Sequence, residues 1–87
     1  MTELRFKKAS GVMLWLLSLI GMVAIVMPWG VCYYRGALHD PLRRHEEVHW
    51  QQYQRYGRIR FPVLYLVESI RHGYRDNRFE IEARKAE

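Results

Sequence analysis

The sequence predicts a mainly α-helical protein, with one transmembrane helix near the N-terminus and about three short helices after it. Three observations support this fold class. Residues 9–34 contain no charged side chain. Pro41 and Pro62 each precede a helix-like stretch and suit the first turn of a helix. Gly57 and Gly73 stand where those stretches end, the position that favours glycine. With 87 residues, the chain has room for a single domain.

The uncharged segment predicts a membrane anchor. Its centre, residues 11–27, would span about 25 Å as a helix, at the short end of what crosses a bilayer. We therefore expect a basic flank over residues 1–8, a transmembrane helix over 9–28, a folded domain over 29–87 and a single-pass membrane location. A buried or surface-docked helix and a cleaved signal peptide are the alternatives. Because basic residues lie on both sides of the segment, the side of the membrane stays open.

The first helix after the anchor is expected over residues 41–56, with Asp40 as its N-cap. Before it, residues 29–36 are rich in valine and tyrosine and can form one short strand. A second helix is expected from Pro62 onward, with an apolar stripe made of Val63, Leu66, Val67 and Ile70. A third begins after Asn77, which has Glu80 three residues later, the spacing of a capping box.

The first of these helices carries the motif His-Glu-x-x-His at His45, Glu46 and His49. Residues four apart share one helix face, so both imidazoles point the same way, as two nitrogen ligands of one zinc ion require. Glu46 is turned by about 100° from His45, which places its carboxylate beside the metal, where it can take a proton from water. The pattern predicts a zinc site with Glu46 as catalytic base.

Three downstream acids are candidates for the third zinc ligand. Glu68 comes level with His49 if the first two helices pack antiparallel, whereas Glu80 and Glu82 lie on the third helix. Residue types and spacing leave the choice open. They also leave open which side chain stabilises an oxyanion, for which the candidates are Tyr65, His72 and Tyr74.

Several stretches of the chain resemble small phage-encoded and prophage-encoded zinc metallopeptidases. They are MPWGV, HEEVHWQQYQRYG, RHGYRDN and FEIEAR, and they extend over most of the chain from Pro28 onward. The E-x-x-A pattern from Glu80 to Ala83 also resembles the second zinc motif of two zincin groups, the ImmA/IrrE type and the membrane-bound CAAX-protease type. The resemblance implies a minimal zincin-like domain, with Glu80 as third zinc ligand beside His45 and His49.

Together these features predict a membrane-anchored zinc metallopeptidase, with membrane lipids and a peptide or protein substrate near the bilayer as its partners. The net charge of +5 suits anionic surfaces. However, the arginines are scattered and no nucleic-acid-binding motif is present, so no nucleic-acid partner is expected. The alternatives are a non-catalytic zinc-binding membrane protein that acts through a protein partner, and a metal-free basic membrane protein. The sequence assigns no oligomeric state.

Overall fold

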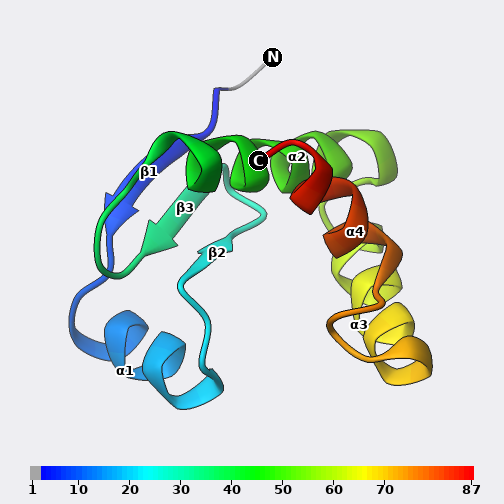
Figure 1. The fold of residues 1–87 in the computed structure, drawn as a ribbon, viewed down its shortest axis with the longest axis horizontal. Helices are drawn as coiled ribbons and strands as arrows, with labels where there is room; N and C mark the ends of the chain where they lie inside the picture. The colour runs from blue at the N-terminus through cyan, green and yellow to red at the C-terminus, as the bar shows by residue number, and fades with distance from the viewer. Residues whose placement is uncertain (1–2) are drawn as a thin grey trace.

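The computed structural model describes residues 3–87, which form a small α/β domain of four helices and a three-stranded sheet. The prediction of a mainly α-helical protein is therefore wrong. Figure 1 shows the sheet with α1 below it on one side, α3 and α4 on the other, and α2 running along both. In chain order the elements are β1 (Arg5–Lys8), α1 (Gly11–Ile20), β2 (Ala24–Val26), β3 (Val31–Tyr34), α2 (Asp40–Tyr56), α3 (Arg60–His72) and α4 (Arg78–Lys85).

The segment predicted as a transmembrane helix, residues 9–28, forms a short helix and a strand instead. α1 ends after 10 residues because Gly21 takes the left-handed conformation at φ 72°, and its N–H bonds to the carbonyls of Leu17 and Ser18. The chain then turns into β2. No helix within residues 3–87 has the length and apolar character needed to cross a bilayer. The predicted transmembrane helix and the single-pass membrane location are therefore both wrong.

The sheet has β3 at its centre, in the order β1-β3-β2. β1 pairs with β3 in parallel, with Arg5 opposite Val31, so the expected basic flank contains a strand. β2 pairs with β3 antiparallel, with Ala24 opposite Tyr34. The strand expected within residues 29–36 is β3. Because β2 is an edge strand, it pairs with another strand, β3, on one side only.

An aromatic core joins the three later helices to one another. Phe61 of α3 lies 4.6 Å from Tyr53 of α2 and 5.1 Å from Phe79 of α4, between ring centroids and edge to face. The hydroxyl of Tyr53 donates to the carbonyl of Val26 at 3.1 Å, which ties α2 to β2. α2 is thus fixed between the sheet and the helical pair α3–α4.

The helix starts differ from expectation by one or two residues. α2 begins at Asp40, and the N-cap is His39, whose Nδ1 accepts from the N–H of Leu42 at 3.3 Å. α3 begins at Arg60, so Pro62 lies inside the first turn, where the missing N–H costs no helical hydrogen bond. The expected N-cap of α4 is confirmed, because the Asn77 side chain accepts from the N–H of Phe79.

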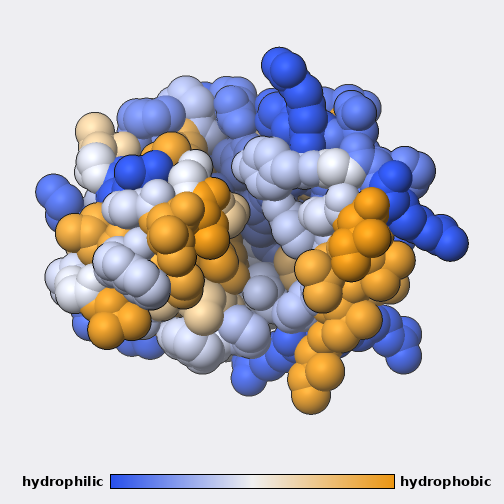
Figure 2. All heavy atoms as spheres, turned by 90° about the horizontal axis from the view of Figure 1, so that it is seen from below, coloured by the Kyte–Doolittle hydropathy of each residue, from blue (hydrophilic) through white to orange (hydrophobic). Residues whose placement is uncertain are grey.

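Two helices leave large apolar side chains in solvent. The apolar stripe predicted for α3 is exposed, and Phe61 is the buried residue of that helix. In α1 only Leu17 is buried. Figure 2 shows the resulting apolar surfaces on either side of a hollow. Their exposed members are Val12, Leu14, Trp15, Leu16, Leu19 and Ile20 of α1, and Val63, Leu66, Val67 and Ile70 of α3.

Two leucines of α1 provide a test of this arrangement. Leu17 is 0% exposed and Leu19 is 66% exposed. We expect Leu17→Ala to lower the free energy of unfolding by about 2–5 kcal/mol, because it leaves a cavity. Leu19→Ala should change it by less than about 0.5 kcal/mol. Urea unfolding of the two variants measures both values. Equal losses would show that α1 does not pack on the domain through Leu17.

Candidate metal centre

Two histidines of α2 and one glutamate of α4 meet in the interior. His45, His49 and Glu80 are 8%, 7% and 1% exposed, and one ligand atom from each lies within 4.8 Å of the others. The two histidines are one helical turn apart and so share a face of α2. Glu80 reaches them because α4 packs against that face. The structure therefore brings together the three residues expected as ligands, in a group that can hold a metal ion.

The distances within this group are close to those of a metal site. Nε2 of His45 is 3.0 Å from Glu80 Oε1, and Nε2 of His49 is 3.1 Å from Glu80 Oε2. Ligands about 2.0–2.1 Å from a tetrahedral zinc ion are about 3.3 Å from one another. Small side-chain movements are therefore enough to admit a cation between the three groups.

The outer nitrogens of both rings are already occupied. Nδ1 of His45 faces Glu87 Oε2 at 2.6 Å, and Nδ1 of His49 faces Gln52 Oε1 at 2.8 Å. A neutral imidazole carries a single N–H. If that hydrogen is on Nδ1, both Nε2 lone pairs point at the Glu80 carboxylate. Lone pairs and a carboxylate repel, so a positive charge must lie between them, either as protons or as a metal ion.

The orientation of the Gln52 amide supports this proton assignment. Gln52 is fully buried, and its Nε2 donates to the carbonyl of Phe79 at 3.0 Å and to Glu82 Oε1 at 2.7 Å. Both partners only accept, so the amide oxygen must be the atom that faces His49. A metal-binding histidine commonly donates its other N–H in this way. Gln52 therefore holds the His49 ring with Nε2 directed into the site.

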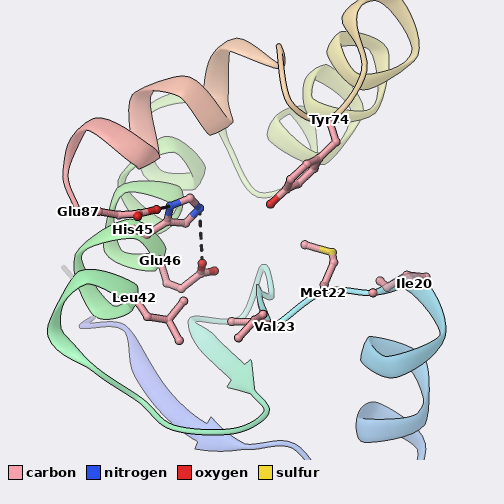
Figure 3. Close-up of a pocket in the computed structure, with 10 residues that line it drawn as sticks. Ile20, Met22, Val23, Leu42, His45, Glu46, Tyr74 and Glu87 are labelled. Atoms are coloured by element: carbon pink, nitrogen blue, oxygen red, sulfur yellow. Dashed lines mark hydrogen bonds and ion pairs between the residues drawn. The ribbon is translucent and has the colours of Figure 1, made fainter.

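Glu87 has the corresponding role for His45. Its carboxylate accepts from Nδ1 of His45 (Figure 3). The guanidinium of Arg44 donates to the backbone carbonyls of Ala86 and Glu87 at 3.0 and 2.7 Å, which holds the chain after α4 against α2. Sequence reasoning did not find Gln52 or Glu87 as partners of the histidines. The spacing of three between His49 and Gln52 was a usable signal, whereas nothing local marks Glu87.

Glu46 lies beside the three-residue group and outside it. Its Oε2 is 3.8 Å from Nε2 of His45, as the second dashed line of Figure 3 shows, and the residue is 4% exposed. Burial raises the pKa of the Glu46 carboxyl above its usual range, although the neighbouring histidines oppose the shift. A carboxylate with a raised pKa is better matched to proton transfer near neutrality.

The charges of the group depend on one another. Burial alone would lower the pKa of both imidazoles, but their hydrogen bonds to Glu80 raise the pKa of His45 and of His49. Burial alone would raise the pKa of the Glu80 carboxyl, yet the same hydrogen bonds hold it well below its usual range. Glu80 is therefore a buried carboxylate that needs cationic neighbours.

The other candidates of the sequence analysis take different places. Glu82 accepts from Gln52 and lies 3.6 Å from Arg55. Glu68 pairs with Arg78 at 3.4 Å and with His72 at 3.5 Å. Neither acid belongs to the group of three. His72 pairs with Glu68 and is not among the residues that line the cavities beside the centre, so it is not placed to stabilise an oxyanion.

The two tyrosines differ in their relation to the centre. The hydroxyl of Tyr65 donates to Glu80 Oε2, so it orients the carboxylate. Tyr74, between α3 and α4, points its hydroxyl into the cavity that Glu46 also lines (Figure 3). Burial, followed by the nearby Glu80 and Glu46 carboxylates, raises the pKa of Tyr74 to about 12. It therefore keeps its proton near neutral pH and remains a hydrogen-bond donor.

The centre opens into two adjoining cavities of about 440 and 510 Å³. His45, Glu46 and Tyr74 line both. The larger runs between β2 and α3, below α2, and reaches the hollow that separates the two apolar surfaces in Figure 2. The candidate metal group thus lies at the floor of a cleft large enough for a small part of a substrate.

Comparison of the chain with family models, with curated proteins and with solved structures finds no match to any of them. The resemblance to phage and prophage zinc metallopeptidases stays a prediction. The function is therefore argued from the geometry of the centre.

Zinc titration of alanine variants tests the ligand set. We expect the wild type to bind one zinc ion per chain, and Glu80→Ala to bind at least about tenfold more weakly, because a charged ligand is lost. Glu82→Ala and Glu68→Ala are matched controls and should keep most of the affinity. Isothermal titration calorimetry measures all four. Loss of zinc in the Glu82 or Glu68 variant with retention in Glu80→Ala would contradict the assignment.

Zinc should also stabilise the fold, because it ties α2 to α4 and does not find the three ligands assembled in the unfolded chain. With free zinc at about 100 times its dissociation constant, the expected gain is about 2.7 kcal/mol. Thermal unfolding with zinc and with EDTA measures the shift. His49→Ala should show no comparable shift. A wild-type melting curve that is the same in both conditions would rule out specific binding.

Proposed function

We propose that this protein is a zinc-dependent metallopeptidase that hydrolyses a peptide bond with Glu46 as general base. The observation that carries the proposal is the placement of one buried carboxylate beside a three-residue metal group at the floor of a cleft. In this mechanism His45, His49 and Glu80 bind the ion, and Glu46 accepts and delivers protons. A membrane anchor forms no part of the proposal.

The donor set favours zinc over other divalent ions. Two imidazole nitrogens and one carboxylate oxygen are the ligands of many catalytic zinc sites, whereas magnesium and calcium prefer all-oxygen sites. Structural zinc sites usually complete four protein ligands. Only three ligating residues converge here within the described part of the chain, residues 3–87. A zinc ion held by these three residues would have room for a water molecule or a substrate as a further ligand.

When bound in this group, zinc supplies Lewis acidity, which makes water more acidic and polarises a carbonyl oxygen. Glu46 accepts the proton released when water attacks the peptide carbonyl. The same carboxyl then delivers that proton to the departing amine. Its position 3.8 Å from Nε2 of His45 places it next to the ligands without joining them.

Tyr74 is the residue best placed to stabilise charge on the carbonyl oxygen. Its hydroxyl points into the cavity and stays protonated near neutral pH. A donor aimed at a developing oxyanion stabilises the transition state more than the ground state. Tyr65 is committed to Glu80 and so acts through that ligand.

β2 provides a binding surface for a peptide backbone. It is one of the two edge strands of the sheet, and residues from Ala24 to Val26 line the larger cavity. An extended peptide can add to such an edge through main-chain hydrogen bonds. Because the Val26 carbonyl already accepts from the Tyr53 hydroxyl, the peptide would pair with other main-chain groups of the strand. A substrate bound there lies beside the metal group, which supports hydrolysis of peptides over other substrates.

Two adjacent glutamates of α2 give a matched test of the mechanism. Glu46 is buried and Glu47 is exposed. We expect Glu46→Gln to lower kcat/KM for a peptide substrate by about 10²–10⁴-fold while zinc remains bound, because the proton acceptor is removed. Glu47→Gln should have nearly wild-type activity. A fluorogenic peptide library with zinc analysis measures both effects.

Equal activity of Glu46→Gln and the wild type would contradict the proposed base. If the zinc-loaded wild type hydrolyses no member of the library, the protein is instead a non-catalytic zinc-binding protein that acts through a partner.

A further inference from the structure

We propose that the cleft selects peptide segments with large apolar side chains, and that Leu66 is a specificity-determining residue on its α3 wall. The proposal rests on the proposed function, because it names the substrate class of the same site. It is carried by the lining of the larger cavity, by its continuity with the metal group and by the position of Leu66.

Among residues 3–87, no charged side chain lines the walls of the cleft outside the catalytic floor. Among the lining residues, His45, Glu46, His49 and Glu80 form the metal group and its base, and Tyr53, Tyr65, Ser69 and Tyr74 are neutral polar residues. All the others are apolar: Met22, Ala24, Ile25, Val26, Met27, Pro28, Phe61, Pro62 and Leu66. A substrate that reaches the metal group therefore contacts mostly apolar groups.

This lining discriminates against charged substrate side chains. A charged group placed against these walls loses its water and finds no partner of opposite charge, which is costly. An apolar side chain in the same place gains from removal of its surface from water. The methionines at 22 and 27 add adaptability, because unbranched thioether side chains adjust to different apolar shapes. The cleft thus favours large apolar residues without requiring one particular residue.

Leu66 differs from the other apolar lining residues in having most of its surface in solvent. It is 60% exposed although it lines the cavity, whereas Phe61 is 3% exposed and already packed in the core. A substrate in the cleft would cover part of Leu66. We therefore expect Leu66 to contribute to substrate binding and little to folding.

The outer apolar side chains of α1 and α3 are not included in this proposal. Ile70 is one turn after Leu66 on α3 and is 76% exposed, but it lines neither cavity. Nothing in the structure shows what covers such residues. Ile70 is nevertheless useful, because it gives a control for Leu66 on the same helix with a similar size and exposure.

The test measures peptide binding separately from hydrolysis. The 87-residue chain with Glu46→Gln, loaded with zinc, is titrated with two fluorescein-labelled decapeptides, one alternating leucine with alanine and the other serine with alanine. Fluorescence anisotropy gives the dissociation constants. We expect the leucine peptide to bind at least about tenfold more tightly.

Three further variants locate the contact on the protein. Adding Leu66→Ser should weaken binding of the leucine peptide about five- to tenfold and leave the serine peptide nearly unchanged. Adding Ile70→Ser should leave both unchanged, and Leu66→Met should restore most of the affinity. Circular dichroism checks that each variant is folded. Because both side chains are exposed, we expect their replacement to leave the fold intact.

Equal affinity for the two peptides would overturn the proposal. So would equal weakening by Leu66→Ser and Ile70→Ser, which would show that the whole apolar face binds without selection by the cleft. Binding to anionic lipid vesicles that competes with the leucine peptide and is lost equally in both variants would indicate a bilayer as the occupant. Tight, Leu66-dependent binding without hydrolysis by the wild type would refute the peptidase function and leave the apolar selectivity standing.

Discussion

The interaction on which the rest of the structure depends is the contact of one buried carboxylate, that of Glu80, with Nε2 of both His45 and His49. A carboxylate that is 1% exposed is stable only if positive charge lies next to it. The outer nitrogens of both rings face acceptors, so that charge must lie on the inner side, between the rings and Glu80. Either two protons or one divalent cation gives the same total charge there. A cation is also compatible with the spacings of 3.0 and 3.1 Å between the Glu80 oxygens and the two imidazole nitrogens.

Much of the surrounding fold serves to keep α4 in position for this contact. α4 has only 8 residues, too few for a stable helix in isolation. Asn77 caps its first turn and donates to the Tyr65 carbonyl and to Ser69 Oγ at 3.2 and 2.9 Å, which ties the start of α4 to α3. Gln52 binds its first turn through the Phe79 carbonyl and its middle through Glu82, and Arg44 binds the residues after it. These contacts approach Glu80 from α2 and α3, so the carboxylate has little freedom to turn away.

The parts of this arrangement that the sequence predicts are local ones. The spacing of His45 and His49 on a capped helix is enough to place two imidazoles on one face, and Asn77 marks the start of α4. The sequence fails where a tertiary interaction overrides a local pattern. Residues 9–28 look like one apolar helix, but the turn at Gly21 and strand pairing with β3 divide them. Glu80 has the spacing of a capping-box residue relative to Asn77, yet its side chain turns to the histidines. Glu87 acts across a sequence separation of 42 residues, which no local pattern encodes.

Zinc K-edge X-ray absorption spectroscopy on the purified, zinc-loaded protein tests the central claim most directly. The account predicts one zinc ion per chain with two imidazole nitrogens and one carboxylate oxygen at about 2.0–2.2 Å, one further light-atom ligand and no sulfur. A spectrum with a sulfur ligand at about 2.3 Å, or with the signature of hexaaqua zinc, would contradict it.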